Sequence, residues 1–277
     1  MTFATLFKSG YRAFIEEDRD RGDLWFFLHI PKTAGSSFRA ELQSLLTPDH
    51  NIHAYDGEAE GEFTDRLGAA IRAFAASTWK TPYRFVSGHV PVDMMEPIRN
   101  AARTPKTFTM LRDPVGRVIS DFRYQSTPQH PDYAVFRARY PSIEAYLDAP
   151  GEGDKMMRYL RPHAAADVAE TIAHVLETFV FVGSMETYDT SFAVMMELLG
   201  ANRAPSVFLR KTEDRQATDV RLTPELESRI RAANARDLAL YDGLMAYVRQ
   251  VDALRRDAPS AGTARAPDSG FSAWRDL

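Results

Sequence analysis

The sequence predicts an α/β fold in which helices cover both faces of a central parallel sheet of about five strands. Short apolar segments rich in aromatic and β-branched residues, typical of buried strands, recur along the chain. Most of them are separated by segments whose apolar residues repeat at helical spacing. The chain has no internal repeat, and its 277 residues are enough for one large domain with a sizeable core.

The composition excludes several classes of protein. A formal net charge of -4 argues against a general binder of nucleic acid or membrane surfaces, although a local basic site stays open. The absence of cysteine excludes disulfides, thiolate chemistry and cysteine metal sites. No apolar run approaches the roughly 20 residues that span a bilayer. The N-terminus has no signal pattern, so we expect a cytoplasmic protein, with peripheral membrane contact left open.

Five segments are predicted to be strands. The first, residues 24–30, is almost continuously apolar and ends before Pro31, which has no N–H for a sheet ladder. Three others are residues 84–90, 107–111 and 179–183, and residues 207–210 are a short fifth strand or an extended segment. The polar, acidic residues 47–62 indicate a loop, and the proline-containing residues 127–141 indicate an irregular connection.

Helices are predicted where apolar residues recur every three or four positions. In residues 1–22 the apolar stripe over 3–15 indicates a helix packed on the domain, because Lys8 and Arg12 are a thin basic complement for a membrane-surface helix. Further helices are expected at residues 38–46, 63–76, 114–124, 142–148, 154–160, 164–178, 188–199 and 222–251. The main domain then spans residues 23–255, and residues 256–277, rich in Pro, Ala, Ser, Gly and Thr, form a disordered tail.

The turn after the first strand has the composition of an anion-binding loop. Pro31 and Lys32 are followed by five small residues, 33–37, and then by a predicted helix. Small side chains let backbone N–H groups face one point, and the positive end of a helix dipole aims at the same point. The hydroxyls in this loop would add donors, and the lysine adds a mobile charge. An ordinary strand-to-helix loop with a solvated lysine is the alternative interpretation.

Two other predicted strands also end in polar residues. Residues 84–90 end in Gly88-His89-Val90, and residues 107–111 run into Arg112-Asp113. Asp113 before Pro114 is a helix start signal. Each residue alone has a structural interpretation: a hydrogen-bonded histidine, or an arginine paired with a nearby aspartate. Because the carboxyl ends of parallel strands meet at one edge, together they predict a site for a doubly anionic ligand with a base beside it.

These motifs resemble those of the sulfotransferases that use 3′-phosphoadenosine-5′-phosphosulfate (PAPS). Residues 31–37 resemble the family's 5′-phosphosulfate loop, and residues 111–120 resemble its 3′-phosphate motif. Residues 87–90 are similar to the segment that bears the catalytic histidine in the uronyl 2-O-sulfotransferase branch of the glycan sulfotransferases. Residues 181–186 and 209–213 also resemble that branch. The resemblance spans about residues 24–250.

The resemblance implies a P-loop-like three-layer fold and transfer of a sulfuryl group from PAPS to an acceptor hydroxyl, on a carbohydrate or a small molecule. In catalysis, Lys32 would neutralise the leaving oxygen and His89 would act as the base. No metal is expected, because a sulfuryl group carries less negative charge than a phosphoryl. The residues implied to bind the donor are Lys32, Thr33, Ala34, Gly35, Ser36, Ser37, Arg112, Ser120 and, in a loop covering it, Arg210, Lys211 and Thr212.

Two other functions stay open at this point. A P-loop kinase or nucleotide hydrolase would need G-x-x-x-x-G-K-[ST], but here Lys32 precedes the small residues, so that pattern fails. A non-catalytic nucleotide- or glycan-binding module would keep the loop without the chemistry. The presence of both Lys32 and His89 argues against it.

Overall fold

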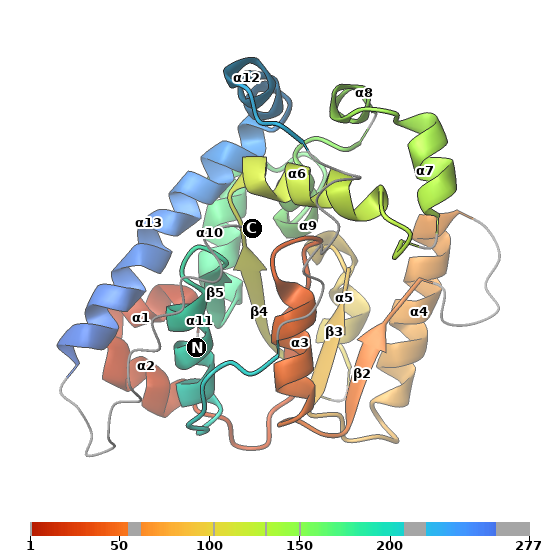
Figure 1. The fold of residues 1–277 in the computed structure, drawn as a ribbon. Coiled ribbons are helices and arrows are strands. Elements are labelled where there is room, and N and C mark those ends of the chain that lie inside the picture. Colours follow the sequence, from red (N-terminus) through yellow and green to blue (C-terminus); the bar gives the residue numbers. More distant parts are fainter. Residues whose placement is uncertain are drawn as a thin grey trace.

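A sheet of parallel strands forms the centre of the molecule (Figure 1). The structure is a computed structural model that describes residues 2–54, 62–101, 103–130, 132–149, 151–207 and 220–258. In this part of the chain the sheet has five strands in the order β2-β3-β1-β4-β5, and all neighbouring pairs are parallel. The strands are β1 (Trp25–Leu28), β2 (Asp49–Ile52), β3 (Phe85–Gly88), β4 (Lys106–Leu111) and β5 (Phe181–Ser184). The predicted α/β class with a five-stranded parallel sheet is confirmed.

The fifth strand of the described sheet lies in a segment that was predicted to be a loop. Val207, the first residue of the predicted strand 207–210, lies in no strand, and residues 208–210 fall outside the described residues. The remaining strand is instead β2, inside the predicted loop 47–62. β2 pairs only with β3 at the sheet edge, and three of its four residues are half-buried. An edge strand does not need a continuous apolar run, so its polar sequence resembles a loop.

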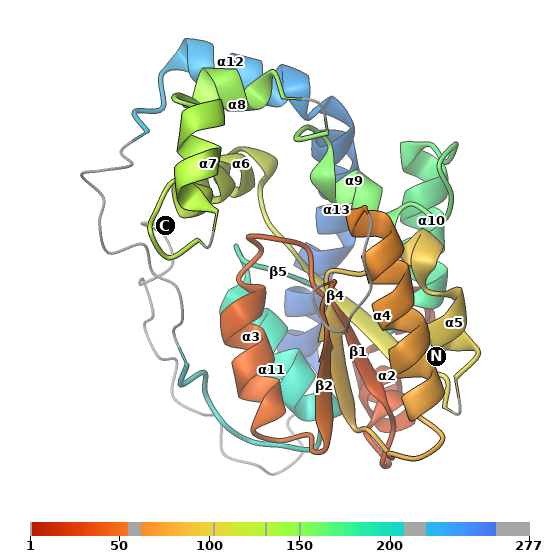
Figure 2. The same ribbon diagram turned by 90° about the vertical axis from the view of Figure 1, so that its right-hand side faces the viewer.

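Helices cover both faces of the sheet (Figure 2). One face is covered by α3 (Gly35–Gln43) and α11 (Tyr188–Leu198), and the other by α4 (Phe63–Ser77), α5 (Glu96–Arg99) and α10 (Val168–Thr178). A short 3₁₀ turn, η1 (Val92–Met94), follows β3.

A further group of helices lies beyond the carboxyl ends of the strands (Figure 1). It contains α6 (Pro114–Gln125), α7 (Tyr133–Arg139), α8 (Ile143–Leu147), α9 (Lys155–Leu160) and α12 (Pro224–Ala233). α7 lies within residues 127–141, where the sequence indicated an irregular connection. The prolines of that segment stand before and after α7 rather than inside it, so they bound a helix without breaking it. A second apolar cluster packs α6, α7, α8 and α12 together through Phe122, Phe136, Tyr146 and Ile230, whereas the buried residues of α9 join the main core.

Both terminal helices are divided. The stripe over residues 3–15 forms α1 (Phe3–Ser9) and α2 (Tyr11–Asp18), separated by Gly10, whose φ of 82° does not suit a helix. Phe3 and Phe14 of these helices are fully buried in the main core. The predicted helix 222–251 forms α12 and α13 (Ala235–Asp257), which meet at Asn234.

The buried side chain of Asn234 forms hydrogen bonds with the end of α12 and with the residue that precedes α9. Its Nδ2 donates to the carbonyl of Ile230 (2.9 Å), and its Oδ1 accepts from the N–H of Asp154 (3.2 Å). α13 continues to Asp257, and residues 259–277 of the predicted tail lie outside the described residues. Of the described helices, none has the length and apolarity to cross a bilayer.

Candidate active site

The sheet register brings the three predicted strand ends together. Leu28 of β1 lies opposite Gly88 of β3 and Thr109 of β4, so His29 and His89 leave the sheet side by side. β4 continues beyond Thr109, which carries Arg112 to the turn that follows β1. There Nη1 of Arg112 donates to the carbonyl of Lys32 (3.3 Å).

The loop between β1 and α3 has the backbone conformation of an anion-binding turn. Lys32 (φ 70°) and Ala34 (φ 64°) are both in the left-handed region, which non-glycine residues seldom adopt and which costs of order 1–3 kcal/mol each. Such turns direct successive N–H groups to one side of the loop. α3 starts at Gly35, and Ala34 at its N-cap has no side-chain oxygen for the first N–H groups of the helix. The helix N-terminus can therefore receive an anion.

The hydroxyls of this loop have different roles. Thr33 is fully buried, and its Oγ1 donates to the carbonyl of Ile30 (2.9 Å). In this structure the hydroxyl therefore closes the loop, and a role of Thr33 in donor binding stays a prediction. Ser36 is half-buried and Ser37 is buried, both in the first turn of α3.

The hydrogen bond made by His89 specifies which of its ring nitrogens carries the proton. Its Nδ1 lies 2.6 Å from the carbonyl oxygen of His29. Because a carbonyl only accepts, Nδ1 carries the hydrogen, and Nε2 of the neutral ring is the acceptor. His89 is half-buried, and its ring lies against those of His29 (4.4 Å between centroids) and Tyr159 (6.4 Å). This tautomer suits a general base.

His29 contacts its neighbours through both its ring and its backbone. The ring stacks on that of Phe27 (5.2 Å, 12°), and the carbonyl accepts from Nδ1 of His89.

Arg112 is 7% exposed, and burial lowers the pKa of its guanidinium, whereas the charges of Glu186 and Asp113 oppose that shift. An arginine still keeps its charge at neutral pH. Gly116 leaves room for it, since a Cβ there would lie 3.3 Å from its Nε. Ser120 lies on α6, and it is half-buried.

The predicted helix start after β4 is present. Asp113 is the N-cap of α6, and its Oδ1 accepts from the N–H of Gly116 (2.9 Å). The N–H of Asp113 donates to Oε1 of Glu186, which follows β5 (2.8 Å). These bonds fix the direction in which α6 leaves the sheet, and with it the position of Ser120.

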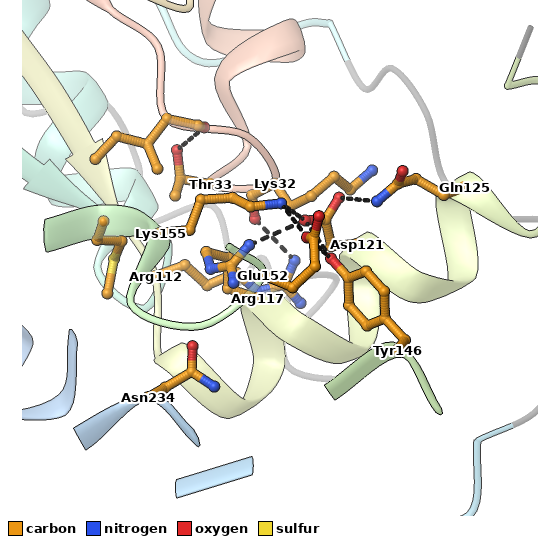
Figure 3. A network of polar contacts seen from close by, with 12 residues as sticks. Lys32, Thr33, Arg112, Arg117, Asp121, Gln125, Tyr146, Glu152, Lys155 and Asn234 are labelled. Carbon is orange, nitrogen blue, oxygen red and sulfur yellow. Dashed lines mark hydrogen bonds and ion pairs between the residues drawn. The ribbon is translucent and has the colours of Figure 1, made fainter. Parts of the chain in front are cut away.

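Sequence reasoning missed a polar cluster on α6, α8, α9 and the segment between α8 and α9, in which Glu152 and Lys155 are half-buried and the other members are buried (Figure 3). We call it the Asp121 network, and its members are Arg117, Asp121, Tyr146, Glu152 and Lys155. Oδ2 of Asp121 accepts from Arg117 (3.1 Å), Tyr146 (3.1 Å) and Lys155 (2.8 Å). Oε2 of Glu152 accepts from Tyr146 (2.6 Å) and Lys155 (2.8 Å). Burial by itself would raise the pKa of Asp121, but Lys155 and Arg117 hold it well below its usual range.

Lys32 extends toward this network (Figure 3). Its Nζ lies 4.1 Å from the centroid of the Tyr124 ring, and its charge contributes to the lowered pKa of Asp121. Its ammonium group therefore lies over α6, the helix that carries Ser120.

A second missed residue is Glu41 on α3. Its buried carboxylate accepts from the N–H of Val207 (2.5 Å), from the hydroxyl and N–H of Ser206, and from Arg203. These bonds attach residues 203–207 to the helix that follows the anion-binding loop. Arg210, Lys211 and Thr212, expected to cover the donor, lie outside the described residues. Among the residues that are described, no group of three or more His, Asp or Glu side chains is arranged to hold a metal ion.

Comparison with known proteins identifies the family. A family model described as the sulfotransferase family matches residues 19–251. No curated protein matches the sequence significantly. Among solved structures, the chain is similar to the mouse sulfotransferase SULT7A1 complexed with PAP, at 13% identity and a TM-score of 0.42, over 92% of this chain and 96% of that chain. That structural likeness is low, and the assignment rests on the family model. Because its match covers most of the sequence, the chain belongs to the sulfotransferase family.

Proposed function

We propose that this protein transfers a sulfuryl group from PAPS to a hydroxyl group of a carbohydrate. One observation carries the proposal: an uncapped helix N-terminus, a buried arginine and a histidine with an accepting Nε2 lie together at the carboxyl ends of β1, β4 and β3. In a parallel sheet this edge is where ligands bind. The family match and the arrangement of this edge support the same reaction.

Residues from two strand ends provide for the two anionic parts of the donor. The N–H groups of residues 33–37 and the start of α3 would receive the 5′-phosphosulfate. Arg112, with a planar and permanent charge, would bind the 3′-phosphate together with Ser120. The bond from Arg112 to the carbonyl of Lys32 holds these two parts of the site against each other.

In the reaction, the acceptor oxygen forms a bond to sulfur while the bond between sulfur and the bridging phosphate oxygen breaks. His89 takes the proton of the acceptor hydroxyl on Nε2. The Lys32 ammonium neutralises the negative charge that develops on the bridging oxygen. Most of the catalysis is then electrostatic positioning, as in phosphoryl transfer. We expect no requirement for Mg²⁺, because the sulfuryl group carries less negative charge than a phosphoryl.

A carbohydrate acceptor is the finer part of the proposal. Its support is the resemblance of residues 87–90 and 181–186 to the uronyl 2-O-sulfotransferase branch. In addition, Arg137 and Arg139 are exposed on α7, beyond the same ends of the strands, and offer cations to an acidic sugar (Figure 2).

Two measurements test the donor and the acceptor separately. Adenosine 3′,5′-bisphosphate, the expected product, should raise the Tm without Mg²⁺, because a ligand that binds only the native state stabilises it. Stabilisation only by ATP with Mg²⁺ would contradict PAPS as the donor.

For the acceptor, mass spectrometry should detect sulfated products from PAPS and a panel of neutral and uronic-acid-containing oligosaccharides. Sulfation of phenols or alkyl alcohols alone would contradict the carbohydrate acceptor and leave the donor intact.

A further inference from the structure

The ring of His29 lies in a row of aromatic rings that leads from the core to His89. The Phe108 ring stacks on that of Phe27 (4.9 Å, 7°), which stacks on that of His29 (5.2 Å, 12°). The His29 ring also contacts the ring of His89, with 4.4 Å between centroids and 33° between planes. His29 is therefore the contact through which the packed core reaches His89 from β1.

The backbone of His29 is held independently of its ring. Its N–H donates to the carbonyl of Gly88 (3.0 Å), which continues the β1–β3 ladder. Its carbonyl accepts from Nδ1 of His89 (2.6 Å). A substitution of His29 keeps these backbone groups and removes only the stacked ring, so the effect of the ring can be measured alone.

Gly35 provides the space for the His29 ring. A Cβ on Gly35 would lie 2.0 Å from Cδ2 and 2.1 Å from Nε2 of His29, far closer than atoms approach. Gly35 is not among the glycines with a positive φ, so its backbone does not need a glycine. The ring needs it. Gly35, the first residue of α3, thus leaves the space that the His29 ring occupies beside His89.

We infer that His29 is a positioning residue: packed between Phe27, Gly35 and His89, its ring holds the His89 ring in the orientation in which Nε2 receives the acceptor proton. This inference rests on the role proposed for His89. A displaced base still permits donor binding but lowers the rate of proton transfer, and misplacement by about 1 Å can cost on the order of 100-fold.

The test is a double-mutant cycle on kcat with His29→Ala, His89→Ala and the double variant. His29→Ala should lower kcat about 10- to 100-fold, with the Kd for adenosine 3′,5′-bisphosphate unchanged. In the His89→Ala background it should cause no further loss, because the residue it positions is gone. The same fractional loss in both backgrounds, or wild-type kcat in His29→Ala, would overturn the inference. Wild-type kcat in His89→Ala would instead overturn the role proposed for His89.

Two further variants separate positioning from folding. His50 of β2 stacks on Phe74 of α4 (5.2 Å, 21°). His50→Ala therefore removes a similarly stacked histidine away from the site and should leave kcat unchanged. Gly35→Ala should lower the Tm, whereas adding it to His29→Ala should lower the Tm no further, because the ring that the new Cβ would strike is absent. A further loss of Tm in that double variant would show that Gly35 does not serve the His29 ring, and would overturn the steric part of the inference.

Discussion

Two clusters of ionisable side chains lie near the carboxyl edge of the sheet, and they are built in opposite ways. The histidine pair, His29 and His89, is half-buried at the ends of β1 and β3 and is held by stacking and by one backbone carbonyl. The Asp121 network lies among α6, α8 and α9, and its charges of opposite sign contact one another directly. In the pair, the hydrogen bond at Nδ1 makes Nε2 of His89 the accepting nitrogen, whereas in the network both carboxylates accept from Tyr146 and from cationic side chains.

The comparison teaches that a cluster of titratable groups does not by itself mark the chemistry. A buried charge is costly unless it is paired, so removing one member of the Asp121 network leaves its partners poorly compensated and should destabilise the fold. In a neutral imidazole whose Nδ1 carries the proton, Nε2 is the basic nitrogen. Substitutions in the histidine pair should therefore change turnover, and substitutions in the network should change stability.

The largest expected effect comes from removing the base. His89→Ala should lower kcat by about 10²–10⁴-fold, because a positioned general base contributes that much to a proton transfer. The measurement is steady-state kcat with a verified acceptor. Calorimetry with adenosine 3′,5′-bisphosphate should give a Kd close to the wild-type value, and a parallel loss of donor affinity would show that His89 acts in binding.

The next effect belongs to the other cluster. Asp121→Ala removes the carboxylate that pairs with the buried guanidinium of Arg117 and leaves Lys155 with Glu152 alone, so it should lower the free energy of unfolding by about 3–5 kcal/mol. Denaturant unfolding measures this. Asp148→Ala is the matched control, because its ion pair with Arg229 (3.1 Å) is exposed and worth about 0–1 kcal/mol.

The pH dependence of that difference sharpens the comparison. The pKa of Asp121 is lower in the folded state than in the unfolded state, so its contribution is complete above the unfolded value of about 3.9. It is lost as the pH falls further, toward the folded pKa. The difference in unfolding free energy between wild type and Asp121→Ala should therefore be constant near neutral pH and shrink below about pH 4. A constant difference at all pH values would mean that the ion pairs do not account for the loss.

A smaller effect is expected from Lys32, whose ammonium group lies over the Tyr124 ring. Lys32→Ala should lower kcat by about 10²–10³-fold, the usual cost of losing one group that stabilises a developing negative charge. KM for the donor should change less than kcat, because the ammonium matters most as the leaving oxygen gains charge. Lys32→Arg should recover part of the loss. If only KM rises, Lys32 serves binding alone.

The smallest effect should follow from Arg112. Arg112→Ala should raise the Kd of adenosine 3′,5′-bisphosphate by about 10- to 100-fold, since a charge-assisted bond to phosphate is worth about 1.5–3 kcal/mol. Adenosine 5′-phosphosulfate, which lacks the 3′-phosphate, should bind almost as well as to the wild type. Equal losses for both ligands would assign Arg112 a structural role.

The sequence was informative where local patterns decide the structure. Buried strands are apolar runs, and Pro31 and the Asp113–Pro114 pair mark their ends, so the strand ends and the residues that follow them were predictable. β2 was not, because an edge strand lacks a continuous apolar run. The divisions at Gly10 and Asn234 were missed because the apolar stripe continues across both.

Polar contacts between distant segments could not be predicted in the same way. Asp121 and Lys155 are 34 positions apart, and Glu41 and Val207 are 166 apart, so only the fold brings them together. The Arg117–Asp121 pair, at the i,i+4 spacing of a helix, was the one sequence signal of the Asp121 network. The tautomer of His89 likewise depends on the carbonyl of His29, which the register of β1 and β3 places beside it.

The most direct test of the proposed reaction is to measure both products of sulfuryl transfer in one assay. Wild-type protein is incubated with PAPS labelled with ³⁵S and with the acceptor panel, in EDTA, and adenosine 3′,5′-bisphosphate and labelled product are quantified together. The proposed reaction predicts that the two form in equal amounts, and that His89→Ala lowers both equally. Failure to transfer label to any acceptor, from protein that binds adenosine 3′,5′-bisphosphate, would contradict it.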